Sequence, residues 1–303
     1  MKNSALWNEL IGQIEEELVF LPDKPEENAK NTLAALWLKA QGVPVSAVRA
    51  EHAQLSDLSE PQIADLRAYL SRRISGEPLA HITGRQDFFG VEFVVGPEAL
   101  VPRRETELLA GAALAKAREA AMVAQPLTII DVCTGSGNVA LELVEHLQRD
   151  NIQARVFAAD LSEDAVRLAR QNAQSLGLER AVEFYAGDLM APFDLAVFAN
   201  GVDLLTCNPP YINQAKVELM PAELSSSEPR LAFDGGPFGV SILMRLVEEA
   251  PRYLKTGGWL AFEVGHGQGR SMTRYLERSG AFADIQASCD DSGEVRAICA
   301  RKI

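Results

Sequence analysis

The chain has 303 residues, of which 47% are hydrophobic and 23% are charged, and its formal net charge is −13. No apolar run approaches the roughly 18 residues that a membrane-spanning helix needs, and three consecutive glutamates in the first twenty residues argue against a signal peptide. These features predict a cytoplasmic protein with two domains and no membrane partner.

The acidic charge argues against a nucleic-acid partner, and the cysteine and histidine pattern argues against a metal site. Residues 87–303 carry 20 basic and 30 acidic side chains. Because nonspecific nucleic-acid binding depends on neutralising phosphates, we expect no direct nucleic-acid partner. We also expect no metal site, because the four histidines form no ligand pattern and no two cysteines are spaced as C-x-x-C. The cysteines are Cys133, Cys207, Cys289 and Cys299.

Residues 1–85 are predicted to form a small helical bundle. The stretch "PEENAKNTLAALWLKAQG" begins with proline and glutamate and stops at Gly42, and "SEPQIADLRAYLSRRISG" repeats this arrangement with Ser59 as its cap. The second stretch places its apolar residues on one helical face, as expected for a helix that packs on others.

Residues 86–110 are predicted to form a hairpin and a linker. The stretch "DFFGVEFVV" alternates around Gly90, "GPEALVPRRETE" follows it, and a helix is expected to begin near Glu105.

From residue 127 onward, strands and helices alternate. This alternation predicts an α/β fold with a mostly parallel, doubly wound sheet, in which the final hairpin makes one edge antiparallel. The expected strands are 127–133, 154–160, 182–188, 202–207, 259–265, 283–289 and 295–302, and the expected helices are 138–149, 162–177, 239–255 and 267–280.

Polar or glycine residues follow four of these strands. The first strand ends in "DVCTGSGN", where two glycines permit a tight turn and a close approach of the backbone to a ligand. Asp160 ends the second strand, 23 residues after Gly137, where a carboxylate accepts hydrogen bonds from ribose hydroxyls. Asp188 ends the third strand, near where an adenine would lie, and the fourth strand ends in "NPPY".

Each of these signals has a simpler structural interpretation, such as a tight turn or a helix cap. Four strand ends in register, each with its own ligand-type residue, favour a nucleoside-containing ligand instead. The loop lacks the third glycine of a dinucleotide fingerprint, because Ala140 stands there, and this favours a ligand without a pyrophosphate.

Six stretches together resemble one family. They are "GEPLAHITGRQDFFGVEF", "LVPRRETELL", "DVCTGSG", "NPPY", "SEPRLAFDGG" and "GGWLAFEVGHGQG". The chain resembles the release-factor glutamine N5-methyltransferases, which are class I S-adenosylmethionine-dependent enzymes. The resemblance implies a Rossmann-like, seven-stranded methyltransferase domain at 111–303, a hairpin and linker at 86–110, and a helical substrate-recognition domain at 1–85. It also implies S-adenosyl-L-methionine as cofactor and peptide-chain release factors, through their Gly-Gly-Gln motif, as substrate.

The resemblance assigns site residues by position. The expected cofactor-binding residues are Asp131, Cys133, Thr134, Gly135, Ser136, Gly137, Asp160, Asp188, Leu189 and Asn208. The expected substrate-binding residues are Phe89, Arg103, Asn208, Pro209, Pro210 and Tyr211, of which the last four are the expected catalytic residues.

The NPPY stretch suits the chemistry of amide methylation. A glutamine amide is a poor nucleophile because its nitrogen lone pair is delocalised, so it must be held in line at near-attack distance. The Asn208 side-chain oxygen and the Pro209 carbonyl can accept its two N–H groups, and two prolines stiffen the loop without adding donors. Tyr211 offers a ring face to the planar amide and to the developing positive charge.

Three departures from the family pattern leave other substrates open. Cys133 stands where the family usually has glycine, "PRRETE" replaces Arg-Pro-Glu-Thr-Glu, and Phe238 replaces an aspartate in "DGGPFG". The alternative is a divergent member that methylates another amide or guanidine nitrogen, on a small molecule or another protein. An adenine-N6 nucleic-acid methyltransferase is disfavoured by the acidic charge. A non-catalytic cofactor-binding module is disfavoured because Asn208 and Tyr211 are intact.

Cys133 and Cys207 end the first and fourth strands, which are neighbours in the resembled fold. Their thiols therefore either lie side by side near the cofactor or are unrelated buried thiols. The second interpretation is preferred for a reducing cytoplasm.

Overall fold

The computed structural model describes residues 3–21, 24–211, 229 and 239–303. Two compact units divide the chain, the first ending at Pro97 and the second beginning at Glu98. None of the helices in the described residues has the length and apolar character needed to span a lipid bilayer.

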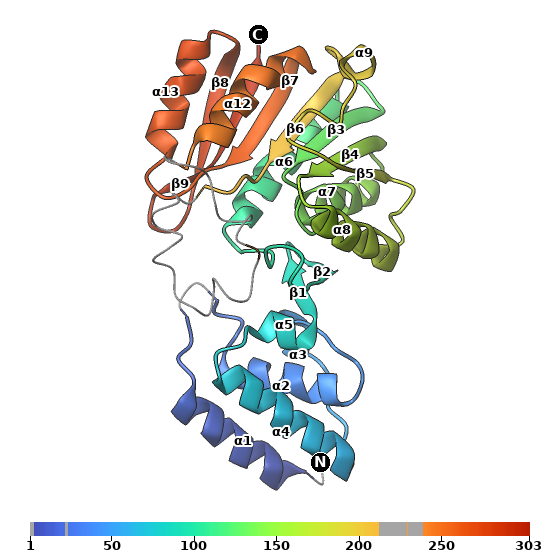
Figure 1. Cartoon of the computed structure of the whole chain (residues 1–303), viewed down its shortest axis with the longest axis vertical. Helices are drawn as coiled ribbons and strands as arrows, with labels where there is room; N and C mark the ends of the chain where they lie inside the picture. The colour runs from blue at the N-terminus through green and yellow to red at the C-terminus, as the bar shows by residue number, and fades with distance from the viewer. Residues whose placement is uncertain (1–2, 22–23, 212–228, 230–238) are drawn as a thin grey trace. The chain divides into compact units, whose positions relative to one another are not determined.

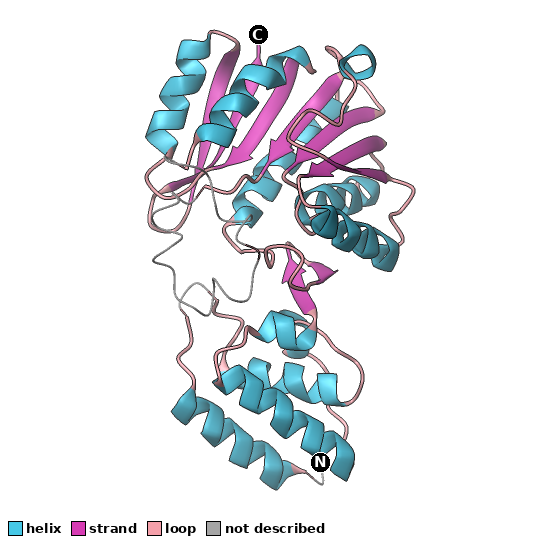
Figure 2. Ribbon diagram, in the orientation of Figure 1, coloured by secondary structure: helices cyan, strands magenta, loops and turns pink. Residues whose placement is uncertain are grey.

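The first unit is a helical bundle followed by a two-stranded hairpin (Figure 2). Its elements are α1 (Ser4–Glu17), α2 (Ala29–Ala40), α3 (Ala47–Ala50), α4 (Glu60–Ile74), α5 (Leu79–Thr83), β1 (Arg85–Phe88) and β2 (Val91–Val94). Asn28 caps α2, and Ser59 forms a capping box at the start of α4. Both caps satisfy N–H groups that a helix start leaves free. Trp37 lies in the core of the bundle and is fully buried. Its ring centroid is 5.7 Å from that of Trp7, in an edge-to-face arrangement.

The second unit is a seven-stranded sheet in the order β5-β4-β3-β6-β7-β9-β8 (Figure 1). Its strands are β3 (Leu127–Val132), β4 (Ala154–Asp160), β5 (Val182–Ala186), β6 (Val202–Cys207), β7 (Leu254–Glu263), β8 (Phe282–Cys289) and β9 (Val295–Lys302). The pairs from β5 to β7 are parallel, and β9 is antiparallel to both neighbours. The predicted fold class is confirmed.

Helices cover both faces of this sheet. They are α6 (Thr106–Ala121), α7 (Asn138–Arg149), α8 (Glu163–Leu176), α12 (Ser241–Glu249) and α13 (Gly269–Ser279) (Figure 1). The short α9 (Leu195–Phe198) lies in the connection between β5 and β6. The helix predicted at 239–255 is shorter than expected. It ends at Glu249 and continues as a 3-10 turn, Ala250–Arg252, because Pro251 has no N–H to continue the α-helical ladder.

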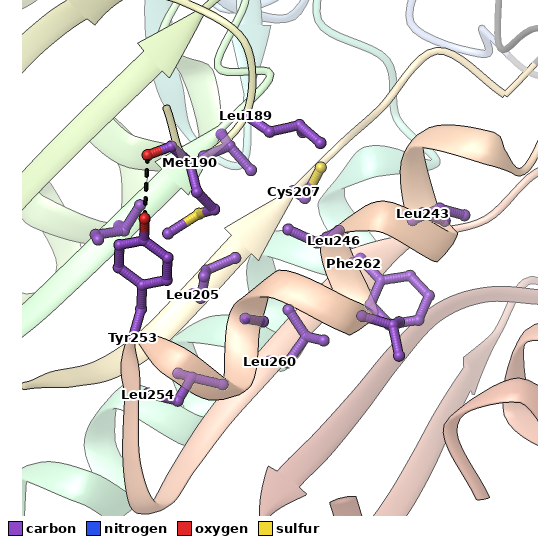
Figure 3. Packing of buried hydrophobic residues seen from close by; sticks show 14 of the residues in the cluster. Leu189, Met190, Leu205, Cys207, Leu243, Leu246, Tyr253, Leu254, Leu260 and Phe262 are labelled. Atoms are coloured by element: carbon purple, nitrogen blue, oxygen red, sulfur yellow. Dashed lines mark hydrogen bonds between the residues drawn. The ribbon is translucent and has the colours of Figure 1, made fainter. Parts of the chain in front are cut away.

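A buried apolar cluster packs α12 against the central strands (Figure 3). Leu243 and Leu246 of α12 lie over Leu205 of β6 and Leu260 of β7. The hydroxyl of Tyr253 donates to the carbonyl oxygen of Met190 at 3.5 Å, which ties the loop after β5 to the start of β7. This cluster fixes the positions of the strand ends at which the candidate site lies.

Candidate active site

The sheet order places the strand ends predicted from the sequence at one edge. The chain enters this sheet at β3, adds β4 and β5 on one side of it, and then returns to add β6 and β7 on the other side. Strand order therefore reverses between β3 and β6. In open α/β sheets the crevice at such a reversal, outside the carboxyl ends of the strands, is where ligands bind.

The glycine loop between β3 and α7 combines one crowded glycine with one open glycine. Both Gly135 and Gly137 have positive φ, at 55° and 81°. A Cβ at Gly137 would lie 3.1 Å from side-chain atoms of both Ala169 and Leu141, whereas a Cβ at Gly135 would meet nothing within 4 Å. The loop thus packs tightly on α7 and α8 at one glycine and leaves open space at the other, as a backbone surface for a ligand requires.

Asp160 ends β4 and its carboxylate faces the glycine loop. Its Oδ2 accepts from the Gly135 N–H at 2.8 Å, and its Oδ1 accepts from the Ser162 N–H at 2.9 Å. Burial raises the pKa of Asp160, and these backbone hydrogen bonds oppose that rise. The geometry places a fixed carboxylate beside the open glycine, where the sequence predicted a ribose-binding group.

Asp131 joins the glycine loop to β6. It is 1% exposed, and it accepts from the hydroxyls of Thr134 at 2.5 Å and of Thr206 at 2.6 Å. Burial raises the pKa of Asp131 to about 6, although both threonine hydrogen bonds favour the ionised form. Because this carboxylate is buried between two threonine hydroxyls, the structure gives Asp131 an anchoring place within the predicted cofactor site.

The other loop residues are close to this anchor. Thr134 and Ser136 are buried, and the Ser136 carbonyl accepts from the Asn172 side chain at 3.0 Å. Cys133 has φ 57°, a backbone conformation that favours glycine, which fits the family's usual residue there. Burial and the adjacent thiol of Cys133 raise the pKa of the Cys207 thiol. The preferred interpretation of two unrelated thiols is therefore wrong, because Cys133 and Cys207 interact directly.

Asp188 and Leu189 follow β5 but point to different surroundings. Asp188 is about half exposed, and its Oδ2 lies 2.9 Å from Nη2 of Arg245 on α12. Leu189 is 5% exposed and belongs to the apolar cluster beneath α12. Arg245 was not predicted from the sequence, and it lies 57 residues after its partner. An ion pair across that separation leaves no local pattern.

The NPPY segment leaves β6 with both of its polar side chains held by other elements. The Asn208 Nδ2 donates to the Thr106 hydroxyl at the start of α6, at 3.1 Å. The Tyr211 carbonyl accepts from the Gln268 side chain at 3.0 Å, and its hydroxyl lies 3.5 Å from Nη2 of Arg296. Pro209 is buried, and Pro210 is partly buried. Burial, followed by the Glu263 and Glu105 carboxylates, raises the pKa of Tyr211.

Four residues around this segment were missed by the sequence reasoning: Thr106, Glu263, Gln268 and Arg296. Three of them lie within stretches that carried the family resemblance, "LVPRRETELL" and "GGWLAFEVGHGQG". Their signal was a polar residue at an element boundary, at the start of α6, the end of β7 and the start of α13.

Two predicted substrate residues lie apart from this cluster in the chain. Phe89, at the tip of the β1–β2 hairpin, has φ 52° and belongs to the first unit. Arg103 precedes α6 in the second unit and is partly buried. Phe238 lies outside the described residues. Within the part of the chain that is described, no group of three His, Cys, Asp or Glu side chains could hold a metal ion.

Known proteins share both units. Residues 125–292 match the family "Methyltransferase domain", and residues 20–84 match the family "PrmC N-terminal domain". The catalytic domain of hMettl16, solved in complex with the MAT2A 3′UTR hairpin 6, is similar in fold. Its TM-score is 0.52 at 12% identity, over 82% of this chain and 84% of that one. The fold and the strand-end site thus define a Rossmann-like methyltransferase.

Curated relatives narrow this class to a family. The release factor glutamine methyltransferase of Moorella thermoacetica is 38% identical over 76% of this chain and 77% of its own length. The enzyme of the same name from Geobacter sulfurreducens is 34% identical over 93% of both chains. The chain belongs to the release factor glutamine methyltransferase family.

Proposed function

We propose that this protein methylates the side-chain amide nitrogen (N5) of the glutamine in the Gly-Gly-Gln motif of peptide-chain release factors, in the cytoplasm, with S-adenosyl-L-methionine as methyl donor. The observation that carries this proposal is the NPPY segment, which leaves β6 beside the glycine loop with Asn208 held by Thr106 and Tyr211 held by Gln268. Membership of the family supports the same substrate.

The strand ends suit the cofactor. Asp160 is the candidate acceptor for the ribose hydroxyls, since its carboxylate is fixed next to the open face of Gly135. Cys133, Thr134, Ser136 and Gly137 complete the loop, Asp131 anchors it, and Asp188 and Leu189 are the candidates on the adenine side. The cofactor supplies an electrophilic methyl group on a sulfonium; the protein has to hold an acceptor nitrogen in line with it.

The NPPY segment would hold the acceptor. An amide nitrogen has two N–H groups, and Asn208 Oδ1 and the Pro209 carbonyl are two acceptors fixed on a stiff turn. When both N–H groups donate hydrogen bonds to these acceptors, electron density on the nitrogen increases and the positive charge that develops there is stabilised. Pro210 limits the freedom of the turn, and the Tyr211 ring offers its face to that charge. No strong base is required, because the amide nitrogen becomes very acidic once it is methylated.

Substrate recognition is assigned to the first part of the chain. A glutamine at a loop tip must reach into a pocket, so a second surface has to grip the rest of the release factor. We assign this role to the helical domain, residues 1–85, with Phe89 and Arg103 of the 86–110 hairpin and linker as contacts. Residues 111–303 hold the cofactor and perform the transfer.

The test is methyl transfer from labelled cofactor to intact release factor. The matched control is a release factor whose Gly-Gly-Gln glutamine is changed to glutamate. We expect label in the first protein and none in the second, in DNA or in a metabolite extract. Label that enters the glutamate control, or that enters DNA or metabolites in preference to release factor, would overturn the proposal and favour a different acceptor.

A further inference from the structure

The Asn208 amide makes a directional contact with Thr106. An amide has a donor end, Nδ2, and an acceptor end, Oδ1, and a threonine hydroxyl has one hydrogen and two lone pairs. Asn208 uses its donor end on the Thr106 hydroxyl at 3.1 Å, and among the described residues none donates to Oδ1. Because Thr106 is 1% exposed, water does not compete for that hydroxyl.

The direction of this contact is set by a buried carboxylate. Glu263, at the end of β7, is 1% exposed and interacts with the hydroxyls of Thr106 and Tyr211. An ionised carboxylate can only accept hydrogen bonds, so it takes the hydroxyl proton of Thr106. Thr106 then has only lone pairs to offer Asn208, and the amide must turn its donor end toward Thr106.

The Glu263 carboxylate has limited compensation for its burial. Arg296 Nη2 lies 3.9 Å from Glu263 Oε1, and within the described part of the chain Oε2 has no hydrogen-bond partner. A buried carboxylate is costly unless it is paired and fully hydrogen-bonded. Both residues that would face the substrate interact with this carboxylate, Tyr211 directly and Asn208 through Thr106. Glu263 therefore has a role in orienting the site as well as in packing.

We infer that Glu263 and Thr106 form a positioning relay, which turns the Asn208 amide so that the site presents an acceptor and selects an amide nitrogen over a carboxylate. This inference rests on the proposed function. A glutamine brings N–H groups to Asn208 Oδ1, whereas a glutamate in the same place brings an ionised oxygen against it. A reversed Asn208 amide would present Nδ2 and suit the glutamate instead.

The relay is sensitive to protonation. Burial raises the pKa of Glu263 to about 7, and its charged neighbours are Glu105 before α6 and Arg296 of β9, the latter also facing Asp290. A protonated Glu263 can donate to Thr106, which frees the Thr106 proton for Asn208 Oδ1. Selectivity for the amide should therefore be complete above this pKa and should fall as the pH is lowered through it.

The test compares two peptides on the full-length protein, one with Gly-Gly-Gln and one with Gly-Gly-Glu. Methylation of the first gives kcat and KM, and the second serves as a competitive inhibitor whose inhibition constant is measured. Thr106→Val removes the hydroxyl at constant shape, and Thr106→Ser keeps it. Thr273→Val is the control, because it removes a hydroxyl that donates to the Gly269 carbonyl of its own helix. Cofactor affinity is measured by calorimetry for each variant.

The preference for the glutamine peptide is the inhibition constant of the glutamate peptide divided by the KM of the glutamine peptide. We expect Thr106→Val to lower kcat by about tenfold and to lower this ratio by about tenfold, the effect of one buried hydrogen bond. Thr106→Ser should keep the preference, Thr273→Val should change nothing, and cofactor affinity should stay constant. In the unaltered protein the preference should weaken between about pH 8 and pH 6, and Glu263→Gln should abolish that change.

Two results would overturn the relay. The first is a Thr106→Val protein that binds cofactor normally and keeps both kcat and the peptide preference. The second is a preference in the unaltered protein that does not change across this pH range, and this measurement needs no variant to fold. If the unaltered protein methylates neither the glutamine peptide nor intact release factor, the proposed function itself fails, and the relay's role as a substrate selector fails with it.

Discussion

Replacing Asp160 by alanine should weaken cofactor binding without unfolding the protein. In the structure its carboxylate accepts two backbone N–H groups, from Gly135 at 2.8 Å and from Ser162 at 2.9 Å. The change removes the candidate ribose acceptor and also frees the glycine loop. Loss of a charged acceptor costs about 1–3 kcal/mol, so the dissociation constant should rise by roughly 5- to 150-fold.

Isothermal calorimetry with S-adenosylmethionine measures this effect, and two further variants separate its causes. Asp160→Asn keeps one side-chain oxygen and should lose less affinity than alanine, because one backbone N–H keeps its acceptor. Asp291→Ala changes an exposed aspartate in the β8–β9 turn and should bind normally. Equal dissociation constants for the Asp160→Ala and Asp291→Ala proteins would show that the strand-end carboxylate does not hold the cofactor.

Three other changes test separate parts of the structure. Glu142 is fully buried on α7, and burial raises its pKa to about 8. A raised folded-state pKa stabilises the protein below the unfolded pKa, and this contribution is lost as the pH rises through the folded value. Glu142→Gln should therefore lose less stability than the unaltered protein between about pH 5 and pH 8 in urea unfolding, and parallel curves would contradict this. Gln268→Glu keeps the acceptor for the Gly265 N–H but loses both donations, to the Tyr211 and Gly239 carbonyls, so kcat should fall about tenfold at unchanged cofactor affinity. Gln174→Glu on the exposed side of α8 is its control, and equal kcat values for the two variants would remove this role. Deleting residues 1–85 should leave cofactor binding within a few-fold and greatly reduce methylation of intact release factor, but not of a short glutamine peptide. A truncated protein that methylates release factor at the full rate would leave the helical domain with no part in recognition.

The sheet and its ligand-facing edge could be predicted because they depend on short-range patterns. Buried parallel strands are continuous apolar runs, and the residues after them are forced to one edge by the topology. Gly135, Gly137 and Asp160 are therefore recognisable by their position after a strand. Pro251 is also visible in the sequence, and because it lacks an N–H it indicates that the helix predicted at 239–255 ends earlier, as the structure shows.

The supporting contacts could not be predicted because they join residues far apart in the chain. Asn208 and Thr106 are separated by 102 residues, and Asp131 and Thr206 by 75. A threonine or a glutamate at an element boundary is compatible with a cap, a surface position or a buried contact, and only the packing of β7 and α6 around β6 decides between these. The interaction of Cys133 with Cys207 likewise depends on strand pairing, in which Val132 is the direct neighbour of Cys207.

The position of Asp131 has a consequence for how the two ligands affect each other. One buried carboxylate accepts from Thr134 in the glycine loop and from Thr206, two residues before Asn208. If cofactor binding moves the glycine loop, the Asp131 carboxylate that also holds Thr206 of β6 is displaced. If substrate binding moves β6, the same carboxylate is displaced from the side of the loop. Thermodynamic linkage is reciprocal, so the factor by which cofactor tightens peptide binding must equal the factor by which peptide tightens cofactor binding. Loss of the shared carboxylate, as in Asp131→Asn, should bring both factors toward one together.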